Sequence, residues 1–151
     1  EAAPTMDGRA WDHMKADGKL AKKIESGEFM VTAELLPAAS ADGAAIEAAL
    51  KALGAGPVAI NVADNHYGVG TSSIAASVMA MKSGAEPICQ IITRDRNRIA
   101  LQSDLLGAAC LGIRNLLCLS GYHQMLAGSP ESANVYDIDS TQWVELAARM
   151  S

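Results

Sequence analysis

The chain has 151 residues, of which 50% are hydrophobic and 19% charged, and its formal net charge is −5. A chain of this length can bury a core without disulfides or metal, and it forms one domain or a piece of a larger one. The chain is acidic overall and lacks the basic stripe that binds nucleic acid or an anionic membrane surface, so we expect neither partner. Its longest uncharged run (65–81) is too polar for a transmembrane helix, so we expect no membrane span.

The N-terminal residues contain neither the basic region nor the apolar region of a secretory leader, and we expect a cytoplasmic protein. Leu20, Ala21 and Ile24 then fall on one helical face, and a glycine follows as a stop signal. We therefore predict an N-terminal helical segment over residues 1–27 and a β/α domain over residues 28–151.

Four short apolar runs, each bounded by turn residues, predict β-strands. They cover residues 31–36, 58–62, 88–93 and 116–119. Their starts are separated by 27, 30 and 28 residues, which is close to an even repeat.

Helical patterns follow each of these runs. Residues that can cap the four helices are Asp42, Ser72 or Ser73, Asn97, and Asp139 or Ser140. The predicted apolar faces are Ile46, Leu50 and Leu53; Ile74, Val78 and Met81; Ile99 or Leu101 with Leu105 and Ala108 to Leu111; and Trp143, Leu146 and Ala147. Glycines end the first three helices.

Strands that alternate with helices predict an α/β fold with a parallel sheet and right-handed crossovers. Such a sheet is either open and doubly wound or part of a (β/α)8 TIM barrel, and a closed barrel takes about 250 residues. Four units of this length are half of one, so we predict the first four units of such a barrel. Both edge strands of a half-barrel would lack a partner. The chain is therefore a fragment of a longer protein, or another polypeptide or second copy completes the barrel, or the sheet is open.

In a parallel β/α fold, reactive groups collect at the carboxyl ends of the strands. Glu34 lies within the first strand between Ala33 and Leu35, where a buried carboxylate is costly unless it is paired or functional. We interpret it as a general acid, with a barrel-interior ion pair or simple exposure at the strand mouth as the alternative.

The next two strands also end in polar residues. After the second strand, Asp64 and Asn65 either hold a ligand hydroxyl or form a turn and helix cap. Within the third strand, Gln90 carries an amide that can bind the edge of a heterocycle. The charged residues after it are Arg94, Asp95, Arg96 and Arg98. We interpret this charged group as a solvated ion-pair cluster at a helix start.

The fourth strand leads to Gly121, where the backbone can approach a ligand closely, and then to a long loop, 125–134, of the kind that holds ligands. Cys89, Cys110 and Cys118 include no C-x-x-C pair, and we predict three buried thiols without a disulfide or zinc role. The histidines are scattered, so we expect no metal site.

Two stretches of the sequence are specific enough to indicate a family. Residues 90–109 read QIITRDRNRIALQSDLLGAA, and residues 112–121 read GIRNLLCLSG. Together with the Thr-Ala-Glu that ends at Glu34 and the VYDIDS at 135–140, they resemble the methylenetetrahydrofolate reductase family, from about residue 24 onward. This resemblance implies a (β/α)8 barrel with a flavin, FAD rather than FMN, at its carboxyl-end mouth. The flavin would pass a hydride to 5,10-methylenetetrahydrofolate and give 5-methyltetrahydrofolate.

By the same resemblance, Glu34 matches the general acid that protonates the folate nitrogen as the methylene bridge opens. The positions that match flavin-binding residues are Ala63, Gln90, Leu119, Ser120, Gly121, Tyr122, Tyr136 and Asp137. The turn of the family commonly reads Leu-x-Gly-Asp, whereas this chain has Tyr122 at the Asp position. A phenol there removes a negative charge and adds a ring that can stack on a flavin or occupy the folate pocket.

The resemblance thus implies an oxidoreductase of one-carbon metabolism that uses a tetrahydrofolate substrate. It also implies a reduced electron donor, which the sequence does not identify, and an oligomer or a complex with another subunit. Three alternatives remain open at this point. They are a relative with another substrate or electron-transfer step, a flavin-binding or non-catalytic barrel subunit that scaffolds a reductase or corrinoid methyltransferase complex, and a methyltransferase that needs no flavin.

Overall fold

The computed structural model describes residues 17–150, so most of the predicted N-terminal segment lies outside the described residues. The strands are β1 (Thr32–Leu35), β2 (Ala59–Val62), β3 (Pro87–Ile92) and β4 (Asn115–Leu119). The helices are α1 (Lys19–Ser26), α2 (Ala44–Leu53), α3 (Ser73–Lys82), α4 (Arg98–Cys110) and α5 (Ser140–Met150), with a short 3-10 helix, η3 (Gln124–Leu126). Within residues 17–150, each predicted strand and helix is confirmed with shifts of a few residues at the ends, and α1 is the part of the predicted N-terminal segment that can be checked.

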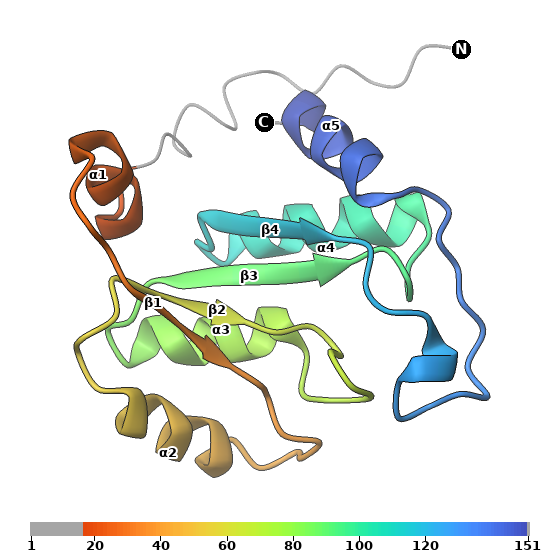
Figure 1. Ribbon diagram of the computed structural model, residues 1–151, viewed down its shortest axis with the longest axis horizontal. Helices are drawn as coiled ribbons and strands as arrows, with labels where there is room; N and C mark the ends of the chain where they lie inside the picture. Colours follow the sequence, from red (N-terminus) through yellow and green to blue (C-terminus); the bar gives the residue numbers. More distant parts are fainter. Residues whose placement is uncertain (1–16, 151) are drawn as a thin grey trace.

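All four strands are parallel and lie in the order β1-β2-β3-β4 (Figure 1). A doubly wound sheet reverses its strand order at a switch point, and this sheet does not. Sequential parallel strands joined by helices are the pattern of the first units of a TIM barrel. The barrel prediction is therefore confirmed, and the doubly wound alternative is wrong.

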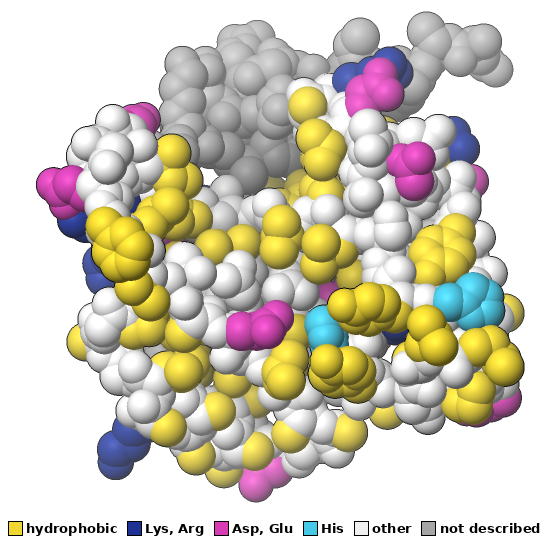
Figure 2. Space-filling view, viewed as in Figure 1, with side chains coloured by type: hydrophobic (Ala, Val, Ile, Leu, Met, Phe, Trp, Pro, Cys, Tyr) yellow, Lys and Arg dark blue, Asp and Glu magenta, His cyan; other side chains and the backbone are white. Residues whose placement is uncertain are grey.

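The strand register places alternate residues on two different faces of the sheet. One face is covered by α2, α3 and α4. In Figure 1, α3 and α4 are drawn behind the strands and α2 below them. On the other face, which we call the open face, no described helix covers Glu34, Asn61, Gln90 and Leu117. Figure 2 looks onto this face and shows hydrophobic side chains spread across it among few charged ones.

Two apolar cores lie between the sheet and its helices. The core under β1 and β2 contains Leu35, Ile46, Leu50, Ile60, Val62, Ala76 and Ala80. The core under β3 and β4 contains Cys89, Ile91, Leu101, Leu105, Ala108, Ile113, Ile138 and Trp143. Burial of these side chains supplies the main driving force for folding.

The predicted apolar face of α3 differs from the observed one. Ile74, Val78 and Met81 are only partly buried, whereas the fully buried positions of the helix are occupied by small residues. These residues are Ser73, Ala76, Ser77 and Ala80. Small side chains let the helix approach the sheet closely, which a prediction based on large apolar residues does not capture.

The predicted helix caps hold in part. Asn97 caps α4 by accepting a hydrogen bond from the amide of Ala100 at 3.0 Å. Asp139 and Gln142 cap α5 reciprocally, because each side chain accepts a hydrogen bond from the backbone of the other. Ser72 is the N-cap residue of α3 but makes no such side-chain bond. At α2 the N-cap position is Gly43, and the side chain of Asp42 still caps the helix by accepting a hydrogen bond from the amide of Ala44 at 2.9 Å.

The three cysteines are free thiols in different surroundings. Cys89 is buried and Cys118 half-buried; burial raises the pKa of both thiols, that of Cys118 to about 11. Cys110 is exposed at the end of α4, so the prediction of three buried thiols is wrong for this residue. Along residues 17–150, no helix is both long and apolar enough to cross a membrane.

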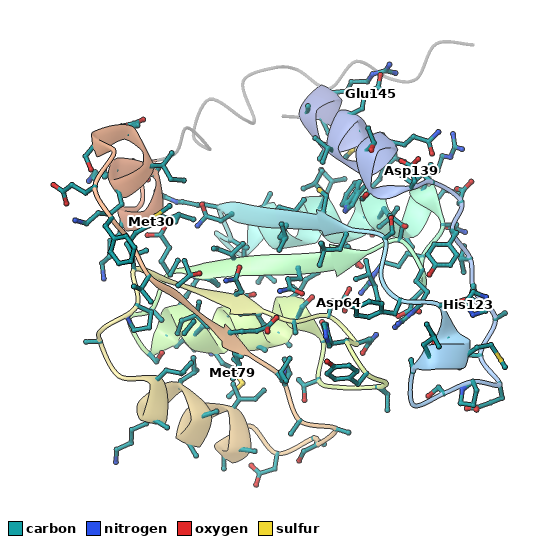
Figure 3. All side chains as sticks on the ribbon, viewed as in Figure 1. Met30, Asp64, Met79, His123, Asp139 and Glu145 are labelled. Atoms are coloured by element: carbon teal, nitrogen blue, oxygen red, sulfur yellow. The ribbon has the colours of Figure 1, made fainter. Side chains whose placement is uncertain are left out.

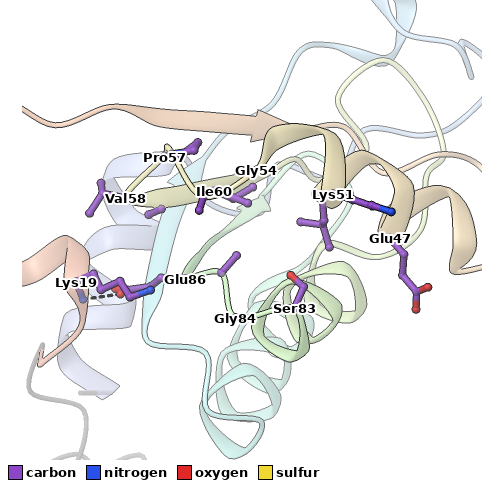
Figure 4. A pocket seen from close by; sticks show the side chains of 14 residues that line it. Lys19, Glu47, Lys51, Gly54, Pro57, Val58, Ile60, Ser83, Gly84 and Glu86 are labelled. Atoms are coloured by element: carbon purple, nitrogen blue, oxygen red, sulfur yellow. Dashed lines mark hydrogen bonds between the residues drawn. The ribbon is translucent and has the colours of Figure 1, made fainter.

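The amino end of the sheet carries the helix α1. The carboxylate of Glu86 accepts hydrogen bonds from the amide of Lys19 at 2.5 Å and from the side-chain amide of Asn115 at 3.0 Å. Beside Glu86 lies an open cavity of about 410 Å³, which Lys51 and Ser83 also line (Figure 4). This cavity is at the opposite end of the sheet from the predicted site residues.

Candidate functional site

The open face brings together two of the predicted residues, Glu34 and Gln90. The side-chain amide of Gln90 donates a hydrogen bond to Oε1 of Glu34 at 3.3 Å. Gln90 is buried, but Glu34 is exposed, so the expectation that its carboxylate is enclosed by apolar neighbours is wrong. The reason is the alternation of side chains along a strand, because Ala33 and Leu35 point to the helices and Glu34 points to the open face.

The turn after β4 brings together three more predicted residues. Gly121 has φ +84°, and a Cβ at this position would lie 3.3 Å from side-chain atoms of Ile92 and Arg94. Its carbonyl accepts a hydrogen bond from the hydroxyl of Tyr136 at 3.1 Å. The backbone amides of Gly121 and Tyr122 donate no hydrogen bond to any residue between 17 and 150. The turn therefore presents two uncommitted donors.

Three rings stand beside this turn, and we call them the aromatic cluster (His66, Tyr67 and Tyr122). The ring of His66 meets that of Tyr67 edge-on at 4.2 Å and that of Tyr122 edge-on at 5.5 Å between centroids. Both tyrosines are exposed. Tyr67 was missed by sequence reasoning, although an aromatic residue in a glycine-rich loop at a strand's carboxyl end was an available signal.

Arg94 lies beneath these loops and is 1% exposed. Its guanidinium donates hydrogen bonds to the backbone carbonyls of Asn65 and Tyr122, at 2.9 and 3.0 Å, and to both oxygens of Asp95, at 2.7 and 3.0 Å. Burial tends to raise the pKa of Asp95, but the hydrogen bonds and charge of Arg94 outweigh it and hold the pKa below its ordinary value.

Arg96 forms a second buried ion pair beside the first. It donates to Asp64 at 2.6 Å and to Asp104 of α4 at 2.7 Å. The prediction of a solvated cluster is thus wrong for Arg94 and Arg96, which are largely buried and bond to other segments of the chain. Arg94 also bonds to the carboxylate next to it in the sequence. The prediction describes Arg98, which is well exposed.

Asp64 and Asn65 have structural partners, which favours the structural alternative for both. Asp64 is buried and also accepts a hydrogen bond from the amide of Ile92 at 3.0 Å. Asn65 has φ +44°, and its side chain accepts a hydrogen bond from the amide of Gly70 at 3.1 Å. Figure 3 shows Asp64 just past β2 and His123 in the loop after β4, both at the carboxyl-end side of the sheet.

Two predicted flavin residues have side chains that hold helix ends. The hydroxyl of Ser120 accepts a hydrogen bond from the amide of Ser140 at the start of α5, at 3.1 Å. Asp137 accepts from the amide of Arg98 at 2.8 Å, and this backbone bond, with the side chain of Arg98, lowers the pKa of Asp137. Their side chains are therefore already committed to protein partners.

The two remaining predicted residues, Ala63 and Leu119, have apolar side chains and lie at the carboxyl ends of β2 and β4. Ala63 is buried and lines a cavity of about 220 Å³ between the loops after β1 and β2, together with Pro37 and His66. Leu119 is half-buried at the end of β4. Five of the nine predicted residues thus form two groups, the Glu34–Gln90 pair on the open face and the Gly121, Tyr122 and Tyr136 group at its carboxyl edge.

With this geometry in place, comparisons with known proteins add one finding. The family described as methylenetetrahydrofolate reductase matches residues 19–142, from the start of α1 into α5. The matched range includes every predicted site residue. A comparison with curated proteins gave no match.

Proposed function

The chain belongs to the methylenetetrahydrofolate reductase family, and we propose that it carries the site at which 5,10-methylenetetrahydrofolate is reduced to 5-methyltetrahydrofolate. The family is one of oxidoreductases of folate-linked one-carbon chemistry, generally dependent on a flavin. The observation that supports the specific reaction is the pairing of Glu34 with Gln90 on the open face, where the carboxyl group accepts a hydrogen bond from a neutral amide.

The residues at the carboxyl end fit a flavin, and we propose FAD. The uncommitted amides of Gly121 and Tyr122 can donate to polar atoms at the edge of the isoalloxazine, and the ring of Tyr122 can lie against its planar face. When bound, the flavin would supply hydride transfer from a reduced donor to the methylene carbon. Tyr136 supports this turn through its bond to Gly121, rather than through a free hydroxyl.

Glu34 is the proposed proton donor. Opening of the methylene bridge leaves a folate nitrogen that must gain a proton, and a carboxyl group on the open face can deliver it. Gln90 orients the carboxyl group through one hydrogen bond.

One observation favours a second candidate. Tyr122 is 56% exposed and stands where the family commonly has an aspartate, so the charge beside the flavin differs from the family pattern. This difference favours a flavin-binding or scaffolding barrel subunit in a one-carbon complex. Such a subunit would hold flavin but would not reduce the folate.

We also propose that the barrel is completed by further β/α units, from the same polypeptide or from another subunit. Among the described residues, β1 pairs only with β2, and β4 pairs only with β3. Unpaired edges of parallel strands are covered in stable folds. The reduced electron donor would reach the flavin in that completed assembly.

The test uses the intact protein in its native assembly. Its flavin is first identified by absorption, then reduced chemically with dithionite, which removes the need to know the natural electron donor. Reoxidation by 5,10-methylenetetrahydrofolate is followed in the unaltered protein, in Glu34→Gln, and in the control Glu47→Gln, an exposed residue of α2.

We expect Glu34→Gln to keep its flavin and to slow reoxidation by about 100-fold or more, as for loss of a general acid, while the control is unchanged. Reoxidation at the unaltered rate in Glu34→Gln would contradict the role of Glu34. A flavin that is never reoxidised by the folate in any variant would favour the scaffolding candidate, and absence of flavin would overturn both.

A further inference from the structure

We propose that Arg94 is the positioning residue of the carboxyl-end site. From beneath, it holds the loops after β2, β3 and β4 against one another, so that the aromatic cluster and the Gly121 turn form one binding surface. This inference rests on the proposed function, because the surface is the one assigned to FAD.

The hydrogen bonds of Arg94 connect three separate loops. The guanidinium reaches the carbonyl of Asn65 after β2, the carbonyl of Tyr122 after β4 and both oxygens of Asp95 in its own loop. The backbone of Arg94 adds two more hydrogen bonds. Its amide donates to the carbonyl of Ser120 at 3.0 Å, and its carbonyl accepts from the amide of Val135 at 2.7 Å. All of these partners except Asp95 are backbone groups, so Arg94 controls the path of the chain.

Both loop residues whose carbonyls accept bonds from the Arg94 side chain are tied to the aromatic cluster. Asn65, with φ +44°, precedes His66, and Tyr122, which follows Gly121 at φ +84°, is itself a member of the cluster. Left-handed backbone at a residue other than glycine persists only where its surroundings hold it in place. The bonds from Arg94 to Asn65 and Tyr122 therefore fix the two chain segments that carry His66 and Tyr122, whose rings meet edge-on.

Arginine is the side chain that can make this set of contacts. Its planar guanidinium presents five N–H donors in a rigid fork, whereas lysine presents one flexible ammonium group. At 1% exposure, the guanidinium is enclosed by protein and does not reach the surface where a ligand would lie. Its effect on a ligand is therefore indirect, through the loops.

Arg96 provides a matched control within the same segment. It is also largely buried and paired with carboxylates, but its side chain bonds to Asp64, Asp104 and the carbonyl of Ile92, and none of its hydrogen bonds within residues 17–150 reaches the turn after β4. Replacement by lysine should therefore weaken the fold at both positions and disturb the site at only one.

The experiment measures FAD affinity by fluorescence titration of the flavin-stripped intact protein, unaltered and as Arg94→Lys and Arg96→Lys. Hydrogen–deuterium exchange of the loops after β2 and β4 is recorded on the same samples without FAD. Asp95→Asn, which removes the charged partner of Arg94, is the second variant in case Arg94→Lys does not fold.

We expect Arg94→Lys to bind FAD about 10-fold to 100-fold more weakly and to exchange faster in both loops, because supporting hydrogen bonds around a bound group have effects of this size. Arg96→Lys should stay within about threefold of the unaltered affinity, and Asp95→Asn should fall between the two.

Equal losses in Arg94→Lys and Arg96→Lys, or an unchanged affinity in Arg94→Lys, would overturn the positioning role while leaving the proposed function intact. Failure of the unaltered protein to bind FAD would instead overturn the proposed function, and this inference with it.

Discussion

Charged side chains hold both ends of the sheet, but they do so at different depths. At the amino end, the carboxylate of Glu86 joins the start of α1 to Asn115, and Asp17 pairs with Arg114 at the surface. At the carboxyl end, Arg94 lies beneath the loops after β2, β3 and β4 and bonds to each of them, and Arg96 joins the loop after β2 to α4. The bonds at the amino end thus attach one helix to the sheet, whereas the bonds at the carboxyl end fix loops relative to one another. In β/α folds, ligands bind at the second of these places.

Among substitutions at the two ends, we expect the largest loss of unfolding free energy from Asp64→Asn at the carboxyl end. This change removes the charge that pairs with the buried Arg96 and weakens the acceptor for the amide of Ile92. Breaking a buried pair by altering one partner costs about 3 kcal/mol of unfolding free energy. Urea unfolding checks this value, and a loss no larger than that of a surface substitution would contradict the burial of the pair.

Two glycines with nearly the same backbone angle allow a sharper comparison. Gly84, at the amino end, has φ +86° and open space where a Cβ would lie, whereas Gly121, at the carboxyl end, has φ +84° and neighbours at 3.3 Å from that position. Gly84→Ala should therefore cost only the backbone strain, about 1 kcal/mol. Gly121→Ala should cost about 2 kcal/mol, because crowding against Ile92 and Arg94 adds to that strain.

Thermal unfolding of the two alanine variants measures this difference directly. If both glycine substitutions cost the same, the close packing beneath the turn after β4 is not a constraint on that turn. A larger cost at Gly121 with unchanged flavin affinity would show that the proposed flavin site tolerates strain in this turn.

Much of the fold could be predicted from the sequence because its signals are local. Runs of β-branched residues bounded by turns predicted the strands, and Asn97 and Asp139 predicted the starts of α4 and α5. The nearly even spacing of the strands favoured barrel units. The buried face of α3 was not predicted, because its closest contacts are made by small residues such as Ala76 and Ala80.

The site was harder to predict because its contacts are distant in sequence. Arg94 looks solvated beside other charges, and its burial depends on carbonyls of Asn65 and Tyr122, which lie 29 and 28 residues away. Glu34 illustrates the opposite case, since its apolar sequence neighbours lie on the other face of the sheet. Local composition indicates neither arrangement.

A smaller effect is expected from Glu86→Ala at the amino end. The variant loses a remote cap of α1 and the bond to Asn115, and loss of a cap typically costs about 1 kcal/mol. We expect faster hydrogen exchange in α1 and no change in FAD affinity. A loss of FAD affinity would contradict the functional separation of the two ends.

The smallest expected effect is a dependence of stability on acidic pH that originates at the carboxyl end. The pKa of Asp95 is lowered in the folded protein, because the bonds and charge of Arg94 outweigh the effect of burial. A lowered folded-state pKa contributes stability above the unfolded value, near 3.9, and this contribution is lost as the pH falls through the folded value. Asp137, whose pKa Arg98 lowers, acts in the same direction.

Thermal unfolding between about pH 5 and pH 2 tests this contribution. Asp95→Asn should be less stable than the unaltered protein at pH 5, and the two should converge as the pH falls, because protonation of Asp95 removes the same charge. The exposed control Glu47→Gln should leave the acid profile nearly unchanged. Parallel curves for Asp95→Asn and the unaltered protein would mean that Arg94 holds the loops through its carbonyl partners alone, and the ion pair would then be incidental to the carboxyl-end site.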